Sequence, residues 1–310
     1  MLGMSTTRNS LLCAALCAVL LAGAAHAGPL TYVRSFSPLP GVSIPQALAT
    51  TLDGGVLVQG PYHLIRFSPG WSPQLDLANE TPGLTNEPYQ WLSGSLQLSD
   101  GRLVGMDYSL NRIVVWNAAG TILTHWAWVS GTQGNSLPRL APNGDFFMAT
   151  TSYGFTTISD WSPNGTIVRW WTAPTTGHVL ALAGGVLYLA GGPTGRIFKF
   201  GLDGTDLGQV PVNTGPNVLG MGVDNSGRIY LSVNNPGLAF LWALSPEGVT
   251  LSTINQLATG TNLAYPSDIL ITGSRLLVAD PSFTGIHEFT IDSPVPTAST
   301  SWGYLKSIYR

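Results

Sequence analysis

A glycine-containing turn recurs six times along this chain at nearly even spacing. After each turn come an apolar strand, a second apolar strand and another glycine turn. The intervals between the leading glycines are 47, 43, 40, 43 and 46 residues, and these glycines are Gly54, Gly101, Gly144, Gly184, Gly227 and Gly273. Each interval is about the length of one four-stranded blade. The spacing predicts an all-β fold, a six-bladed β-propeller.

Two apolar strands are predicted in every repeat, each short and bounded by turns, as expected for strands buried on both faces. The second strands are predicted at 56–58, 103–106, 146–149, 187–190, 229–233 and 276–279. The third strands are predicted at 64–67, 113–116, 157–161, 197–200, 240–244 and 286–289. The sixth repeat has no good outer strand, whereas residues 30–36 form a strand without a partner. We therefore expect the N-terminal strand to complete the last blade and close the ring.

The first 27 residues have the features of a secretory signal. Arg8 lies in a short basic head, an apolar run follows from Leu11 to Ala25, and Ala25-His26-Ala27 is a small-x-small cleavage site. The competing interpretation is an uncleaved anchor, but the run is shorter than the roughly 20 residues of a membrane-spanning helix. We expect a signal peptide at 1–27, a propeller at 28–294 and a C-terminal tail at 295–310. The tail is either a frayed end or a sorting or docking tag.

The composition narrows the possible functions. Both cysteines, Cys13 and Cys17, lie in the signal, so the mature chain would have no disulfide, thiolate metal site or cysteine nucleophile. Without Arg8 the chain has a net charge of −4 and no basic run, which makes nucleic acid an unfavourable partner. The repeats use nearly the whole mature chain, so no second domain is expected. We expect a monomer that has no transmembrane segment after signal cleavage and is secreted, or held in the periplasm or cell envelope.

Two segments carry a resemblance to a known repeat. Tyr265-Pro266-Ser267-Asp268-Ile269, with Leu276 to Asp280 and Ile286 to Phe289, resembles an NHL-type repeat, and so does Asp100 to Asp107 followed by Asn111-Arg112-Ile113. The pattern covers all six units but is sharp in the second and sixth. The superfamily implied includes binding propellers and, more distantly, gluconolactonase-type metal-dependent lactonases.

The lactonase resemblance implies a divalent cation, such as calcium, in the central channel. In those enzymes carboxylate and Asn oxygens from the starts of inner strands hold the cation, in keeping with the oxygen ligands that hard cations require. The equivalent positions here are uncharged: Gln46, Ser93, Ser136, Thr176, Leu219 and Ser267. A shift of one or two residues would instead bring in Asn217 and Asp268 as metal ligands, with Asp268 also a candidate base. The first expectation is no metal and no cofactor.

Other catalytic arrangements are weak in this sequence. The mature chain has four histidines, His63, His125, His178 and His287, and none has metal-ligand spacing with another. His178 precedes an inner strand and is the one candidate general base. His287 and Glu288 are adjacent in a strand and must point to opposite faces. Asp107 and Asp280 end second strands, where we expect them to accept backbone N–H bonds. We therefore assign no catalytic residue.

Tyrosines and asparagines collect in the loops predicted on one face of the ring. Propeller geometry places the second-to-third-strand loops and the blade-to-blade loops on the same face. The residues predicted to bind a ligand there are Tyr62, Tyr108, Tyr153, Asn217, Asn234 and Tyr265. Such an uncharged surface suits a neutral polar ligand, a glycan or a peptide. The alternative is that asparagine and glycine are present as turn formers.

Outer strands carry Trp126, Trp128, Trp170 and Trp171, which can fill the gaps between blades or stack on a flat ligand. Taken together, the sequence favours an exported, non-catalytic binding or interaction propeller whose partner is a glycan, peptide or protein. The alternatives are a metal-dependent lactonase-like hydrolase with a channel cation, and a structural element of the cell envelope.

Overall fold

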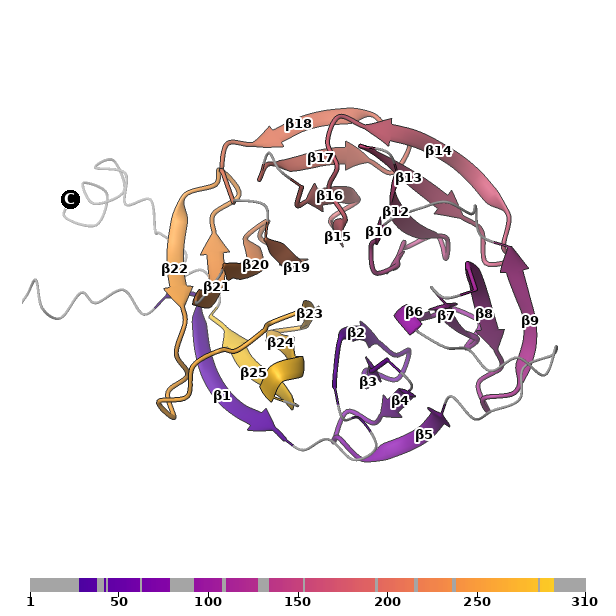
Figure 1. Cartoon of the computed structure of the whole chain (residues 1–310), viewed down its shortest axis with the longest axis horizontal. Helices are drawn as coiled ribbons and strands as arrows, with labels where there is room; N and C mark the ends of the chain where they lie inside the picture. The colour runs from indigo at the N-terminus through magenta and orange to yellow at the C-terminus, as the bar shows by residue number, and fades with distance from the viewer. Residues whose placement is uncertain are drawn as a thin grey trace, which may run out of the picture.

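Six antiparallel sheets form a closed ring, each with its inner strand toward the centre (Figure 1). The computed structural model describes residues 28–37, 42, 44–61, 63–78, 92–107, 110–127, 134–152, 154–192, 195–214, 217–235, 238–283 and 285–292. The predicted signal and the tail at 295–310 lie outside these residues. Apart from one 3-10 turn, η1 (Pro281–Phe283), all the regular structure described is β, which confirms the predicted all-β, six-bladed propeller.

Each blade runs from an inner strand beside the channel to an outer strand on the rim. Blade 1 contains β2 (Ala47–Thr50), β3 (Val56–Gln59), β4 (His63–Phe67) and β5 (Pro73–Ala78). Blade 2 contains β6 (Leu92–Gln97), β7 (Leu103–Asp107), β8 (Arg112–Trp116) and β9 (Ile122–Ala127). In blade 3 the inner position is divided between two short strands, and its members are β10 (Gly134–Asn135), β11 (Arg139–Leu140), β12 (Phe146–Ser152), β13 (Phe155–Trp161) and β14 (Ile167–Ala173).

The second half of the ring repeats this order. Blade 4 contains β15 (Val179–Ala183), β16 (Val186–Ala190), β17 (Ile197–Gly201) and β18 (Asp206–Val210). Blade 5 contains β19 (Val218–Val223), β20 (Ile229–Asn235), β21 (Leu238–Leu244) and β22 (Thr250–Ile254). Blade 6 contains β23 (Asp268–Thr272), β24 (Arg275–Asp280), β25 (Gly285–Ile291) and, from the other end of the chain, β1 (Leu30–Phe36). We call the face on which the inner strands begin the upper face.

The six leading glycines lie in the turns that join inner strands to second strands. All six have a positive φ, between 56° and 92°, the left-handed region that glycine enters without steric cost. In four of these turns the glycine N–H donates to the carbonyl three residues earlier, as Gly101 does to Leu98 at 3.0 Å. The repeat is therefore visible in the sequence because each hairpin needs this backbone conformation at the same place.

The N-terminal strand closes the ring, as predicted. β1 pairs antiparallel with β25, from Leu30 opposite Ile291 to Phe36 opposite Ile286. Side chains reinforce the ladder, because Arg34 Nε lies 2.8 Å from Glu288 Oε2 and Tyr32 packs edge-on against Phe289. Figure 1 shows β1, in indigo, beside the yellow strands of the same blade. Residues from the two ends of the chain thus share one sheet.

The core consists of apolar clusters that lie within and between the blades. Phe146 of β12 stacks on Trp126 of the preceding blade at a ring distance of 6.3 Å, and Trp171 lies 6.1 Å from both Phe147 and Phe200. These two tryptophans therefore fill gaps between blades, as one of the two interpretations of the outer-strand tryptophans predicts. Trp128 lies outside the described residues.

Among the described residues, none of the helical structure is long and apolar enough to cross a membrane.

Candidate functional site

The central channel opens at the upper face into a hollow of about 250 Å³. We call it the upper mouth. Most of the residues that line it lie at or near the starts of inner strands, where blade-to-blade loops enter the ring, and Pro281 follows the second strand of blade 6. The lining residues are Gln46, Leu137, Arg139, His178, Val179, Leu180, Leu219, Tyr265, Ser267 and Pro281. Propeller topology brings these positions, more than 200 residues apart along the chain, to one rim. The upper mouth is therefore the place where every blade except the second contributes a described residue to one cavity.

One arginine crosses the channel at the base of the upper mouth. Arg139, on β11 of blade 3, donates from Nε to the Leu180 carbonyl of blade 4 at 2.8 Å. Its Nη2 lies 3.1 Å from Oδ1 of Asp268, at the start of β23 in blade 6. The Arg139 side chain also borders a second hollow of about 190 Å³, farther down the channel. The ion pair thus lies between the two hollows and joins blades on opposite sides of the ring.

Asp268 is completely buried and has a partner for each carboxylate oxygen. While Oδ1 faces Arg139, Oδ2 accepts the backbone N–H of Leu48 in blade 1 at 2.8 Å. Burial raises the pKa of the Asp268 carboxyl group, and the Arg139 guanidinium and the Leu48 N–H act in the opposite direction. The charge of Arg139 is permanent, so the pair places a fixed cation in the channel next to its counter-ion.

The described residues do not fit a divalent cation in the channel. They include no group of three or more His, Cys, Asp or Glu side chains able to hold a metal. Asp268 is bound to a guanidinium, and Asn217 donates its amide to Asn235 Oδ1 at 3.1 Å. Hard cations require several oxygen ligands, usually including carboxylates. A guanidinium already supplies the positive charge beside Asp268.

The six positions compared with the lactonases are distributed among several places. Gln46, Leu219 and Ser267 line the upper mouth, so the alignment by glycine turns finds part of the channel rim. Ser136 is buried, with its Oγ accepting the Ala149 N–H at 2.7 Å. Ser93 lies in β6, and Thr176 borders a different hollow on blade 3.

The residues predicted to bind a ligand have different positions. Tyr62, Tyr108 and Tyr153 lie outside the described residues. Tyr265 lines the upper mouth and is 41% exposed. Asn217 and Asn234 extend the pairing of β19 with β20, because the Asn217 carbonyl accepts the Asn234 N–H at 3.0 Å. Of the described members of this set, Tyr265 is the one that borders the upper mouth.

A buried carboxylate fixes the loop that carries Tyr265. Asp280, at the end of β24, accepts the backbone N–H groups of Ala264 and Tyr265 at 2.9 Å each and that of Phe283 at 3.2 Å. Burial works to raise the pKa of Asp280, but the His287 ring and these N–H groups outweigh it, so the pKa lies below its ordinary value. The predicted structural role of Asp280 is confirmed, and it extends to the blade-to-blade loop.

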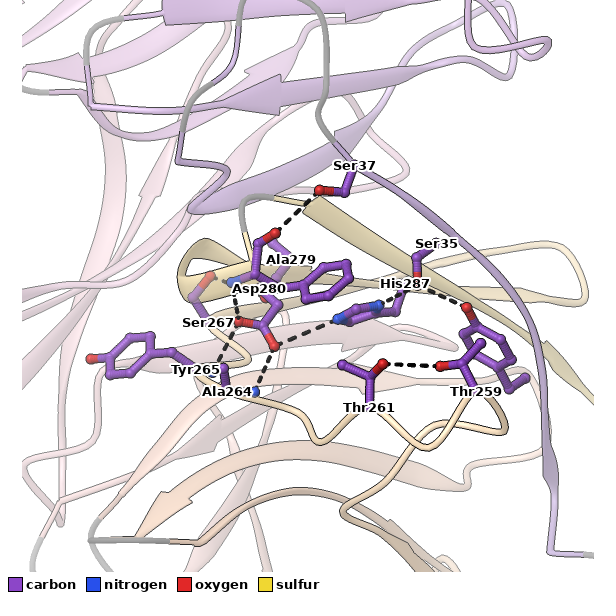
Figure 2. A network of polar contacts seen from close by, with 12 residues as sticks. Ser35, Ser37, Thr259, Thr261, Ala264, Tyr265, Ser267, Ala279, Asp280 and His287 are labelled. Atoms are coloured by element: carbon purple, nitrogen blue, oxygen red, sulfur yellow. Dashed lines mark hydrogen bonds and ion pairs between the residues drawn. The ribbon is translucent and has the colours of Figure 1, made fainter.

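A polar chain leads from Asp280 to the N-terminal strand (Figure 2). His287 Nε2 lies 3.5 Å from Asp280 Oδ2, and His287 Nδ1 lies 2.7 Å from Ser35 Oγ on β1. Tyr32 Oη in turn lies 2.8 Å from Ser35 Oγ. His287 and Asp280 are fully buried, so this Ser-His-Asp series ties strands together and leaves no room for a substrate at the imidazole. In Figure 2 the Tyr265 ring points away from this chain.

His287 and Glu288 act separately, as their adjacent positions in a strand predict. Glu288 lies 2.8 Å from Arg34 and 3.8 Å from Arg275, on the opposite face from His287. His178, the candidate general base, borders the upper mouth, where burial lowers the pKa of its imidazole. Burial thus favours the neutral imidazole, which can both donate and accept a hydrogen bond.

Sequence reasoning did not identify Arg139. A signal was present, since Arg139 and Asp268 each lie five residues before a leading glycine, Gly144 and Gly273. The corresponding residues of the other repeats are uncharged: Ala49, Leu96, Val179 and Gly222. Opposite charges at one register position in the third and sixth of six repeats would have predicted a pair across the channel.

Comparison with known proteins finds similarity in structure alone. No family model and no curated protein matches the sequence. Virginiamycin B lyase from Staphylococcus aureus superposes with a TM-score of 0.58 at 13% identity, covering 84% of this chain and 99% of that one. The shared feature is the propeller fold. A gluconolactonase from Xanthomonas campestris has a TM-score of 0.56 at 15% identity, covering 81% of this chain and 88% of that one. A catalytically inactive histidine-to-alanine variant of the lyase, crystallised with quinupristin, has a TM-score of 0.58 at 12% identity, covering 84% and 98%.

Proposed function

We propose that this protein is an exported, non-catalytic binding propeller that recognises a neutral polar ligand, a glycan or an extended peptide, at its upper mouth. It would act as a monomer, either secreted or in the periplasm or cell envelope. The observation that carries the proposal is the position of Arg139. Its guanidinium and Asp268 neutralise each other in the channel, and the other described residues that line the upper mouth have side chains without a net charge.

The chemistry of the upper mouth supports a neutral ligand. Gln46 offers an amide, Tyr265 a phenol with a ring face, and His178 a neutral imidazole. These groups donate and accept hydrogen bonds without a net charge, and an aromatic ring can stack on a flat or apolar face of a ligand. Leu137 and Leu219 add apolar contact area on the same rim. A concave site with a few convergent polar groups is the usual form of a small-ligand site.

The Tyr265 loop is prepared for binding before a ligand arrives. Its backbone is held by two hydrogen bonds to the buried Asp280, so little conformational entropy remains to be lost when the ring makes contact. Ser267, two residues farther on, donates from Oγ to the Gln46 carbonyl at 3.0 Å and joins blade 6 to blade 1. The polar rim is thus rigid where the two ends of the repeat array meet.

The second candidate is a metal-dependent lactonase-like hydrolase, favoured by the structural likeness to a gluconolactonase. That likeness, at 15% identity, concerns the fold. The proposed cation ligands, Asn217 and Asp268, are bound to Asn235 and Arg139 respectively. A channel cation would have to displace Arg139 from Asp268, which makes this candidate the weaker one.

Two measurements separate these candidates. Elemental analysis and calcium titration of the purified protein should find no stoichiometric divalent ion and no change of Tm with a chelator. Glycan and peptide arrays should then identify a neutral ligand whose affinity falls at least about tenfold in Tyr265→Ala, the loss of one good aromatic contact. Val249→Ala, which alters an exposed residue just before β22, serves as the control. A tightly bound ion whose removal lowers Tm, or lactone hydrolysis lost in Asp268→Asn, would replace this proposal with the hydrolase.

A further inference from the structure

The outer strand of blade 3 carries two adjacent tryptophans with different environments. Trp171 packs between Phe147 and Phe200 and fills the space toward blade 4. Trp170 is 66% exposed, the largest exposed fraction among the large apolar side chains described. A tryptophan normally buries most of its large surface, so an exposed indole on a rigid strand is an unusual feature of a folded surface.

The register of the sheet groups Trp170 with other uncharged side chains. Trp170 lies opposite Ser159, and Thr172 lies opposite Thr157, so all four point to the same face of blade 3. Phe155 precedes Thr157 by two residues and shares that face, and it is 65% exposed. Trp171 points to the opposite face. One side of the outer edge of blade 3 thus presents two exposed aromatic rings with threonines between them.

A hollow adjoins this surface at the upper end of the blade. It has a volume of about 490 Å³ and is lined by Gly154, Phe155, Thr172, Ala173, Pro174, Thr175 and Thr176. The described lining residues contribute hydroxyl groups, one aromatic ring and backbone, and none of them has an ionisable side chain. The nearest charged pair on the strand, Arg169 with Asp160 at 3.1 Å, belongs to the other face of the sheet.

We propose that this surface, the rim platform of Phe155, Trp170 and Thr172, is a binding site for a neutral glycan chain. It is separate from the upper mouth and does not depend on the function proposed there. Aromatic rings stack on the apolar faces of sugar rings, and threonine hydroxyls exchange hydrogen bonds with sugar hydroxyls. Along the ladder of β13 and β14, Phe155 lies four residues away from Trp170, a distance of about 13 Å at the rise of a β-strand. This separation suits a ligand with more than one sugar ring.

Other occupants fit the rim platform less well. A membrane surface is usually bound through basic side chains beside the apolar ones, and the residues described on the platform face and in its hollow include none. A second copy of this chain would be expected to use a continuous apolar patch, whereas here Thr172 and the threonine-lined hollow separate the two rings. The alternation of rings and hydroxyl groups is what a neutral polysaccharide matches.

The test measures binding of the whole protein to neutral hexasaccharides of glucose, xylose and mannose by calorimetry. At least one should bind, and Trp170→Ala and Phe155→Ala should each weaken it about tenfold or more, while Trp170→Phe keeps most of the affinity. Leu207→Ala, at an exposed residue of β18, is the matched control and should change nothing. Because both platform rings are exposed, unfolding curves of the variants should overlay that of the wild type.

Several results would overturn the rim platform. They are the absence of binding to every hexasaccharide, or equal affinity in wild type, Trp170→Ala and Phe155→Ala. If the protein self-associated in sedimentation and Trp170→Ala abolished this, the surface would be assigned to a second copy of the chain. If it bound phosphatidylcholine vesicles and Trp170→Ala abolished that binding, the surface would be assigned to a membrane. Tyr265→Ala distinguishes the two proposed sites, because it should leave platform binding intact even if the upper mouth proves to have no ligand.

Discussion

The guanidinium of Arg139 lies 3.1 Å from the carboxylate of Asp268, although the two residues belong to blades on opposite sides of the ring. Because Arg139 also bonds the Leu180 carbonyl and Asp268 accepts the Leu48 N–H, four blades meet at this ion pair. Asp268 is completely buried, and the side chain of Arg139 is 15% exposed. A buried pair of this kind contributes little net stability, but the loss of one partner is costly.

Arg139→Met should therefore lower the free energy of unfolding by about 3–5 kcal/mol, since Asp268 would be left as an unpaired buried carboxylate. Urea denaturation measures the change. The control is Arg196→Met, which removes an exposed arginine bonded to Gln209 at 3.3 Å and should cost less than about 1 kcal/mol. The double variant Arg139→Met with Asp268→Leu should recover most of the loss. If Arg139→Met were as stable as the wild type, the charge pair would not hold the channel together.

Much of the fold is predictable from the sequence because its signals are local. Gly54 and its five counterparts mark hairpins that need a positive φ, and short apolar runs between turns mark buried strands. The closure by residues 30–36 is predictable by counting, since the sixth repeat lacks an outer strand and the N-terminal strand lacks a partner. Each of these inferences depends on residues that are close in sequence or on the number of repeats.

The site was predictable only in part, because it depends on which faces and ends of strands converge. Tyr265 was placed on the upper face, where it lines the mouth. The Arg139 and Asp268 pair joins residues 129 apart, and the signal for it is found only by comparing one register position across all six repeats. For Trp170 and Trp171, the sequence cannot say which ring faces the neighbouring blade, since a register shift between Asp160 and Trp161 decides it.

Alanine substitutions at two glycines with the same φ can distinguish the stability cost of backbone strain from that of steric overlap. Gly54 and Gly165 both have a φ of 80°, but a Cβ at Gly54 would meet open space, whereas one at Gly165 would overlap the Trp126 ring. Gly54→Ala should cost about 1–2 kcal/mol for the left-handed conformation alone. Gly165→Ala should cost a further 1–3 kcal/mol, roughly, because Trp126 must move off Phe146.

Thermal and urea unfolding of both glycine variants give the comparison, and the near-UV circular dichroism of Gly165→Ala should change because Trp126 moves. Gly54→Ala should keep the wild-type spectrum. If both substitutions lowered the free energy of unfolding by the same amount, the Trp126 ring would move without loss of stability. Its stacking would then contribute little to the packing of blades 2 and 3.

The lowered pKa of Asp280 predicts that the protein loses stability as the pH falls. Its pKa in the folded protein lies below the ordinary value of 3.8, so the unfolded state binds the proton more tightly. The stability that it contributes is present above the unfolded pKa and is lost as the pH falls through the folded pKa. Asp280→Asn, which gives up charge-assisted bonds to the Ala264 and Tyr265 N–H groups, should be about 2–4 kcal/mol less stable at pH 7.

The difference between wild type and Asp280→Asn should be constant from about pH 5 to pH 7 and should shrink below about pH 3. Urea unfolding across this range tests it. Asp100→Asn is the control, because Asp100 has a lowered pKa but is largely exposed, and its partner Arg102 keeps a bond to the Pro163 carbonyl. A difference that stayed constant down to pH 2 would show that Asp280 acts through packing and not through its charge.

The closure by β1 predicts that the last blade can be completed in trans. Deletion of residues 30–36 should lower the free energy of unfolding by at least about 3 kcal/mol, because Leu30, Tyr32 and Phe36 lose contacts with the sixth blade and the first. The free edge of β25 should also promote aggregation.

A synthetic peptide of residues 28–37 should restore both Tm and the monomer in sedimentation, since the ladder and the Ser35 bond to His287 can re-form. The same peptide with Ser35→Ala should bind more weakly, and a scrambled peptide should have no effect. A truncated chain that remained monomeric with the wild-type Tm would show that the ring does not need its N-terminal strand.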